Sequence, residues 1–195
     1  MQYVSRGKLI VVLVAVCQLL VTFCSKPLYP DSSFQNIKSR AEKNQLDAFM
    51  DAGTEKVLNT HNTSADKIIN TARKYIGVPH CMGGKTIKCM DCSGLLVTVF
   101  AKYKIYLPHN SQEQARYGEI INEMDKLRKG DLVFFIRSYE TNNFITHSGI
   151  YIGENKFIHT SSKKGVTITK LTDPYWNEKF IFGTRIMKEK GTTNK

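Results

Sequence analysis

One cysteine has a position in the chain that suits nucleophilic chemistry. Cys92 follows Asp91 and opens a predicted helix that runs from about residue 93 to residue 104. The positive end of the helix dipole and the unpaired amide groups at a helix start favour the thiolate, which is the reactive form of cysteine. The same position is also typical of a buried structural cysteine. Further groups are therefore needed to decide between the two interpretations.

Two histidines supply such groups. A cysteine nucleophile needs a base within hydrogen-bond reach, and the base needs a partner that fixes its tautomer and orientation. His147 begins one predicted strand, and His159 lies on the next. We therefore expect His147 to act as the base for Cys92 and His159 to orient His147. The alternative is a pair of unrelated histidines in a sheet.

The hairpin between the two histidines sets a condition on this hypothesis. Its predicted strands, 147–152 and 156–161, flank Gly153-Glu154-Asn155. A simple two-residue turn at Glu154-Asn155 would place His147 and His159 on opposite faces of the sheet, because side chains alternate along a strand. The catalytic hypothesis therefore predicts an odd-length loop or a bulge in this hairpin.

The elements that must position these residues are helices followed by strands. Ser64 is a good N-cap for a helix that ends at Gly77, and residues 110–117 are predicted as a short helix with Ser111 and Gln114 spaced as a capping box. Helices followed by consecutive strands indicate an α+β fold, with helices packed on a central antiparallel sheet. The predicted strands cover residues 132–136, 147–152, 156–161, 166–171 and 180–187.

The N-terminal residues are typical of an export signal. Arg6 and Lys8 precede an apolar run that is shorter than the ~20 residues that span a bilayer comfortably. Cys24 ends this run and resembles the lipidated cysteine of a bacterial lipoprotein, although Phe23 stands where that pattern prefers Gly, Ala or Ser. We predict a signal peptide at residues 1–23 and lipidation of Cys24. The alternative is an uncleaved membrane anchor.

Length and composition bound the domain organisation. The chain has 195 residues, of which 42% are hydrophobic and 23% charged, and this mixture excludes a wholly disordered chain. We place a tether at residues 24–63, the catalytic domain at 64–188 and a tail at 189–195. Within the tether, residues 34–50 have the pattern of a short amphipathic helix.

The net charge of the chain is strongly positive. It is +11 for the whole chain, and loss of the signal peptide would remove two positive and no negative charges, leaving +9. A basic exported protein most simply meets anionic polymers of the cell envelope or lipid headgroups. Export argues against nucleic acid as a partner. A solvated basic surface needs no partner at all, so the charge alone decides nothing. We expect a membrane contact through the lipid on Cys24, and nothing in the sequence sets the oligomeric state.

Five segments occur in an order that matches a known family. They are Asp91-Cys92-Ser93-Gly94-Leu95, Leu107-Pro108-x-x-Ser111-x-x-Gln114, Gly130-Asp131-Leu132-Val133-Phe134-Phe135, His147-Ser148-Gly149-Ile150-Tyr151-Ile152-Gly153 and Phe157-Ile158-His159. Over about residues 64–188 the chain resembles the NlpC/P60 cell-wall cysteine peptidases, which have a papain-like fold. The resemblance implies Cys92 as nucleophile, His147 as base and His159 as the orienting residue.

The resemblance also implies a substrate and a way of stabilising the reaction. It implies hydrolysis of amide bonds in peptidoglycan stem peptides, often between D-γ-glutamyl and a diamino acid, without a metal or an organic cofactor. The backbone N–H of Cys92 would form part of the oxyanion hole, as expected of a helix N-terminus. We place Asp91 and Ser93, on either side of the nucleophile, among the substrate-binding residues.

Two histidines depart from the pattern of the family. His80 stands where family members often carry a tyrosine that helps to line the site, and we expect His80 to bind substrate or to assist Cys92. The alternative is a histidine that only packs or is solvated. His109 takes the place of the usual basic residue after Leu-Pro, and we expect it to be only a surface residue. Both differences concern the choice of substrate more than the reaction itself.

The cysteines near Cys92 leave other interpretations open. Cys89 and Cys92 have a C-x-x-C spacing that is found in zinc and redox sites. A disulfide between Cys81 and Cys89 is plausible in an exported protein, whereas one between Cys89 and Cys92 would block the nucleophile. The alternative functions are a peptidoglycan-binding lipoprotein without catalysis and a related Cys–His amidase or acyltransferase that acts on another substrate.

Overall fold

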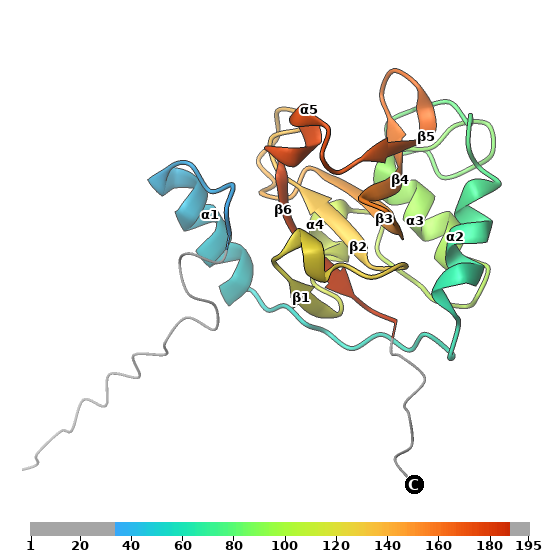
Figure 1. Ribbon diagram of the computed structural model, residues 1–195, viewed down its shortest axis with the longest axis horizontal. Helices are drawn as coiled ribbons and strands as arrows, with labels where there is room; N and C mark the ends of the chain where they lie inside the picture. Colours follow the sequence, from blue (N-terminus) through green and yellow to red (C-terminus); the bar gives the residue numbers. More distant parts are fainter. Residues whose placement is uncertain (1–33, 188–195) are drawn as a thin grey trace, which may run out of the picture. The chain divides into compact units, whose positions relative to one another are not determined.

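A computed structural model describes residues 34–187, all of which belong to one compact unit of the chain (Figure 1). The predicted signal peptide, Cys24 and the tail at 189–195 lie outside the described residues. The helices are α1 (Arg40–Asp51), α2 (Ala65–Arg73), α3 (Cys92–Ala101), α4 (Ser111–Gln114), α5 (Pro174–Asn177) and a 3₁₀ turn, η2 (Met124–Lys126). The strands are β1 (Glu119–Ile121), β2 (Leu132–Phe135), β3 (His147–Gly153), β4 (Lys156–Ser161), β5 (Gly165–Lys170) and β6 (Phe180–Arg185).

The six strands form one antiparallel sheet in the order β1-β6-β2-β3-β4-β5. This confirms the predicted α+β fold. Sequence reasoning missed β1, because its three residues are too few to show an alternating pattern. None of the helices in the described part of the chain combines the length and the apolar character that a membrane span requires.

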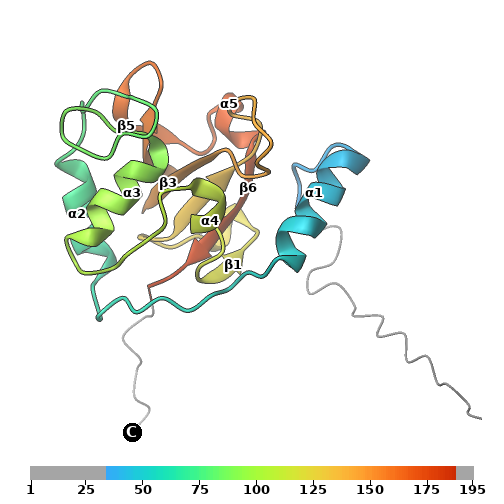
Figure 2. The ribbon, with the colours of Figure 1, turned by 180° about the vertical axis from the view of Figure 1, so that it is seen from behind.

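Helix α3 covers one face of the sheet, with α2 beside it (Figure 2). Its sequence is apolar around most of its circumference, and Leu95, Leu96, Val99 and Phe100 have no exposed surface. A helix that is apolar on nearly all sides is buried on nearly all sides. This burial fixes the first residue of α3, Cys92, in relation to the strands.

A second apolar cluster covers the other face of the sheet. Strands β2, β3 and β4 contribute Val133, Phe135, Tyr151 and Phe157, and Trp176 of α5 packs against the cluster from outside. Strand β2 is buried at every position, which explains why its sequence is continuously apolar rather than alternating. The sheet therefore lies between two apolar layers.

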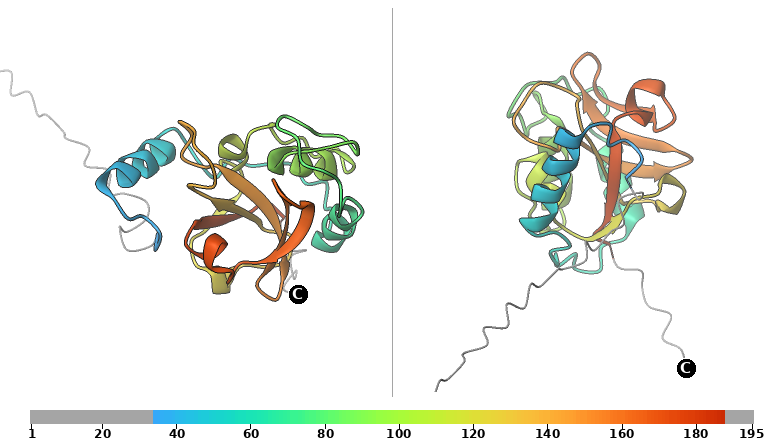
Figure 3. Two further views of the ribbon diagram at one scale, coloured as in Figure 1. Left: turned by 90° about the horizontal axis from the view of Figure 1, so that it is seen from above. Right: turned by 90° about the vertical axis from the view of Figure 1, so that its left-hand side faces the viewer.

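Residues 34–63, which we call the N-terminal strap, pack onto the domain. Helix α1 begins after the N-cap Ser39 and lies alongside β6 (Figure 3). The rings of Phe34 and Phe49 contact Phe182 of β6, with centroid distances of 6.1 and 5.9 Å. An amphipathic helix is thus present, but it begins at Arg40 rather than at the predicted residue 34. Over residues 34–63 the structure differs from the expected tether, because these apolar side chains are buried.

Arg116 is the main polar contact between the strap and the domain. Its Nη1 donates hydrogen bonds to the carbonyl oxygens of Phe49 and Gly53, both at 2.9 Å, and its guanidinium lies over the Phe49 ring. Nε donates to Glu113, and only 6% of Arg116 is exposed. A buried guanidinium that satisfies the end of a helix in this way joins α1 firmly to α4.

Replacement of Arg116 should therefore loosen the strap. We expect Arg116→Met to lower the free energy of unfolding by about 2–3 kcal/mol, because the carbonyl groups of Phe49 and Gly53 lose their donor. Urea unfolding of the chain from residue 25 measures this. Lys126→Met, which removes an exposed ion pair with Glu123, is the control and should change little. Equal effects of the two substitutions would contradict the structural role of Arg116.

Candidate active site

Asp91 organises the start of the helix that carries Cys92. It is the N-cap of α3, and its Oδ1 accepts hydrogen bonds from Gly94 N at 2.6 Å and Ser93 Oγ at 2.9 Å. Oδ2 accepts from Gly83 N at 2.8 Å, which ties the preceding loop to the helix. A Cβ atom at Gly94 would lie 2.0 Å from the carbonyl oxygen of Gly84, so only glycine allows this approach.

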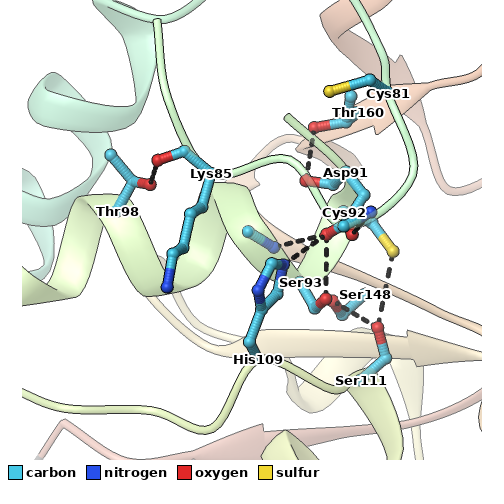
Figure 4. Close-up of polar contacts among 12 residues, drawn as sticks. Cys81, Lys85, Asp91, Cys92, Ser93, Thr98, His109, Ser111, Ser148 and Thr160 are labelled. Atoms are coloured by element: carbon cyan, nitrogen blue, oxygen red, sulfur yellow. Dashed lines mark hydrogen bonds and ion pairs between the residues drawn. The ribbon is translucent and has the colours of Figure 1, made fainter. Parts of the chain in front are cut away.

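His109 also contacts Asp91, and the expectation that it is only a surface residue is wrong. Its Nε2 lies 3.1 Å from Oδ1 of Asp91, and a quarter of its side chain is exposed (Figure 4). On the other side, Thr160 Oγ1 of β4 donates to the carbonyl oxygen of Asp91 at 3.1 Å. Asp91 is therefore held by the loop, by His109 and by the sheet at once.

The thiol of Cys92 lies at the end of a chain of polar side chains. Its Sγ is 3.4 Å from Ser111 Oγ, which is 3.0 Å from Ser148 Oγ, and Ser148 donates to Gln114 Oε1 (Figure 4). The capping box predicted from Ser111 and Gln114 is wrong, because Asn110 is the N-cap of α4. Ser111 faces the thiol instead, and the side chain of Gln114 turns inward.

The protonation of Cys92 depends on two opposing effects. Burial raises the pKa of the Cys92 thiol, whereas hydrogen bonds from Ser111 and from the backbone of Ser148 and Ser93 lower it, and the net pKa is raised. The thiol is therefore neutral at neutral pH in the resting protein. A thiol in this state can act as a nucleophile only when a base removes its proton.

The hairpin of β3 and β4 contains the bulge that the catalytic hypothesis requires. Ile150 pairs with Ile158 and Tyr151 with Phe157, but Gly153 pairs with Lys156, so the strand carries one extra residue at Ile152. Glu154 and Asn155 both have φ of 53°, as in the type I′ turns of tight hairpins. The bulge brings His147 and His159 to one face of the sheet.

The two histidines are joined by a hydrogen bond. Nε2 of His147 lies 2.9 Å from Nδ1 of His159, and Nε2 of His159 lies 3.0 Å from Thr169 Oγ1 of β5. When His147 and His159 both carry hydrogen on Nε2, each donates to the next group in this chain. Nδ1 of His147 is then the nitrogen that can accept a proton. A Cβ atom at Gly149 would lie 3.3 Å from Cβ of His159, so glycine leaves room for this arrangement.

Burial keeps both imidazoles neutral. Burial, together with a smaller contribution from His80 and against the opposing effect of Asp91, lowers the pKa of His147 to about 3. Burial also holds the pKa of His159 well below its usual range. A neutral imidazole with a free Nδ1 is the form that a general base requires.

One cavity of about 820 Å³ brings these groups together. Each of the six residues predicted to act in catalysis or substrate binding lines it. The six residues are His80, Asp91, Cys92, Ser93, His147 and His159.

The thiol of Cys92 and the imidazole of His147 are not hydrogen-bonded to each other. Among the described residues, the hydrogen-bond partner of Cys92 Sγ is Ser111, and catalytic hydrogen bonds are often longer before substrate binds.

Sequence reasoning missed several residues of the cavity. Ser111 and Thr169 touch the thiol and the histidine pair, Tyr139 and Tyr175 line the cavity, and Trp176 packs on both imidazoles. The available signal for Trp176 was its place after an N-cap and a proline in Asp173-Pro174-Tyr175. That signal indicates a helix start but does not show what the indole covers.

The cysteines have different states. Cys81 and Cys89 form a disulfide, and Cys92 is free. The expected disulfide between Cys81 and Cys89 is therefore present, and the bond between Cys89 and Cys92 that would block the nucleophile is not formed. The sulfur of Cys89 is also unavailable to a C-x-x-C zinc or redox site.

Comparison with known proteins identifies the family. The family model described as NlpC/P60 matches residues 77–185. The chain belongs to the NlpC/P60 family. It is 31% identical to an Escherichia coli protein named Murein DD-endopeptidase MepS/Murein LD-carboxypeptidase, and the match covers 96% of this chain and 95% of that protein.

Two further relatives match about two thirds of the chain. A Bacillus subtilis protein named Gamma-DL-glutamyl hydrolase is 37% identical over 65% of this chain and 30% of its own length. The crystal structure of an NlpC/P60 family protein from Bacillus cereus has a TM-score of 0.59 and 30% identity, and it covers 65% of this chain and 41% of that one. The chain thus spans less than half the length of these two proteins.

The buried histidines of the NlpC/P60 domain should make it sensitive to acid. The unfolded chain binds protons at both histidines below pH ~6.5, whereas the folded state keeps His147 neutral down to about pH 3. The free energy of unfolding should keep the full contribution of the two histidines above pH ~6.5. Below that pH it should fall by up to ~1.4 kcal/mol per pH unit for each histidine. Urea unfolding between pH 6.5 and 5 measures this slope.

Substitution separates the histidine contribution from that of other groups. His159→Gln should reduce the slope, because glutamine does not titrate. His61→Gln, in an exposed part of the strap, removes a histidine without affecting the site and should leave the slope unchanged. A slope that is the same in the protein and in His159→Gln would contradict the neutral buried pair.

Proposed function

We propose that the protein is a cysteine peptidase that hydrolyses amide bonds in peptidoglycan stem peptides. The observation that carries this proposal is one cavity lined by a free cysteine at a helix start and by two linked, neutral histidines. These are the nucleophile, base and orienting group that acyl transfer requires. In this proposal Cys92 is the nucleophile, His147 the base and His159 the orienting residue.

The reaction follows from the protonation states. Sγ of Cys92 attacks the amide carbonyl while its proton passes to Nδ1 of His147, and the His159 side of the ring stays hydrogen-bonded. The backbone N–H of Cys92, among the unpaired amides at the start of α3, faces the developing oxyanion. His147 then gives its proton to the leaving amine, and the C–N bond breaks. Water, deprotonated by His147, hydrolyses the thioester and restores the thiol.

The substrate class rests on the relatives and on the cavity. The E. coli relative is named for endopeptidase and carboxypeptidase activity on murein, and the B. subtilis relative for hydrolysis of γ-DL-glutamyl bonds. Lys163 and Lys164 line the cavity and match the carboxylates that stem peptides carry. We therefore propose the bond between D-γ-glutamyl and a diamino acid as the target, with His80, Asp91 and Ser93 near the bound peptide.

Digestion of purified muropeptides tests the proposal. The chain from residue 25 should release new stem-peptide fragments, and Cys92→Ala should release none. His147→Gln should lower kcat/KM by about 10²–10⁴-fold because the general base is lost. His159→Gln should cause a smaller loss, because it orients His147 without accepting the thiol proton. Mass spectrometry of the fragments identifies the bond.

The outcomes also distinguish the alternatives. His61→Gln is the matched control and should retain full activity, because His61 lies outside the cavity. Muropeptide binding without cleavage would favour a docking lipoprotein. Absence of both binding and cleavage would favour an amidase or acyltransferase that acts on another substrate.

The location of the protein is a separate proposal. We infer that residues 1–23 are an export signal, that Cys24 is lipidated and that the domain acts at the cell envelope, next to a membrane. The basic n-region, the short apolar run and the position of Cys24 support this inference. An exported site agrees with the disulfide between Cys81 and Cys89.

Mass spectrometry of the mature protein tests the anchor. We expect the N-terminal peptide to begin at a diacylated or triacylated Cys24, and Cys24→Ala should move the protein from the membrane fraction to the soluble fraction. The loss of membrane association follows because a lipid chain supplies the hydrophobic attachment. An intact Met1 terminus would show an uncleaved anchor instead.

A further inference from the structure

Trp176 packs against both members of the histidine pair. The centroid of its indole lies 4.7 Å from the ring of His147, with an interplanar angle of 33°, and 4.7 Å from the ring of His159, with an angle of 75°. Phe135 and Phe157 close the remaining sides of the cluster, with centroids 4.9 and 5.5 Å from the indole. One indole therefore covers both imidazoles.

The helix that carries Trp176 is held mainly by contacts from outside it. Helix α5 has four residues, too few to be stable alone. Nδ2 of Asn36, in the N-terminal strap, donates hydrogen bonds to the carbonyl oxygens of Asn177 and Phe180, both at 2.8 Å. Arg137 donates to the carbonyl oxygen of Glu178 at 2.7 Å. The strap thus supports the end of α5, although it lies outside the matched family domain.

This arrangement affects the two states of His147 differently. In the resting state the indole excludes water from one side of the pair, which favours the neutral imidazole. When His147 accepts the proton of Cys92, the tilted indole face contacts the new imidazolium, and this cation–π contact offsets only part of the hydration that burial removes. Trp176 also restricts the rotation of His147, so that Nδ1 stays directed toward the cavity.

We propose that Trp176 is a positioning residue for the pair of His147 and His159, and that Asn36 of the strap holds Trp176 in place. The proposal rests on the proposed function for its catalytic consequence, but the contact itself can be measured without substrate. A purely structural indole would affect the stability of the domain and leave the histidines as they are.

Groups other than Trp176 also influence the pKa of the two histidines. The charged or titratable groups that act on His147 are His80 and Asp91, and Thr169 is the hydrogen-bond partner of His159. The other charged or titratable residues that line the cavity are Cys92, His109, Tyr139, Lys163, Lys164, Asp173 and Tyr175. None of these groups changes when Trp176 is shortened. Removal of the indole admits water, and because burial is the largest cause of the low pKa of His147, the pKa should rise.

Nuclear magnetic resonance of ¹⁵N-labelled histidines tests the contact. The full chain in mild detergent is titrated from pH 8 to pH 2, because the pKa of His147 is about 3, and the protonation midpoints of both imidazoles are compared with those of Trp176→Phe and Trp176→Ala. We expect Trp176→Ala to raise the midpoints by about one pH unit or more, and Trp176→Phe to raise them less. Tyr75→Ala, which truncates a buried ring after α2, is the control and should not move them.

A matched pair of variants tests the role of the strap. Asn36→Ala should raise the same midpoints by less than Trp176→Ala and shift the fluorescence of the single tryptophan of the chain. Asn59→Ala removes the same side chain at an exposed position of the strap and should change neither quantity. If Trp176→Ala does not fold, the midpoints of Trp176→Phe and Asn36→Ala show whether the indole influences the protonation of the two histidines. Unchanged midpoints in the folded variants would overturn the proposal.

Activity separates this proposal from the proposed function. With muropeptides, Trp176→Ala should lower kcat by about 10-fold or more and move the acid limit of kcat/KM to higher pH, while KM changes little. If the unmodified protein cleaves nothing but the midpoints move, the proposed function fails and the positioning role stands. If cleavage occurs and neither the midpoints nor the acid limit move, the positioning role fails alone.

Discussion

The hydrogen bond between His147 and His159 is the interaction on which the arrangement of the site depends. Two imidazoles can be buried side by side only when both are neutral and each satisfies the other, because an unpaired buried charge or donor is costly. This requirement explains the bulge at Ile152, which brings both rings to one face, and Thr169, which ends the chain of donors. It also explains the apolar cover above the rings.

Asp91 has a comparable role on the opposite side of the cavity. One carboxylate caps α3, fixes the loop at Gly83 and contacts His109, so the position of Cys92 depends on a single buried acidic group. The resting thiol and the resting imidazole are both neutral, because burial raises the pKa of Cys92 and lowers the pKa of His147. In the proposed reaction, charge on Cys92 and His147 therefore develops only when the proton is transferred between them.

The N-terminal strap lies outside the matched family domain but packs against it. Residues 77–185 match the family, yet Phe34, Phe49 and Arg116 join the strap to β6 and α4, and Asn36 reaches the end of α5. The strap and the residues that line the cavity are thus parts of one packed unit.

The sequence by itself determined the local features of this protein: the start of α3 at Cys92, most strands, the α+β order and the need for a bulge between the histidines. These follow from caps and from side-chain alternation, which act over a few residues. Only the tertiary structure decided that Ser111 faces the thiol, that His109 contacts Asp91 and that the strap is packed. Asn36 and Asn177 are 141 positions apart, and such contacts depend on how whole elements pack rather than on any local pattern.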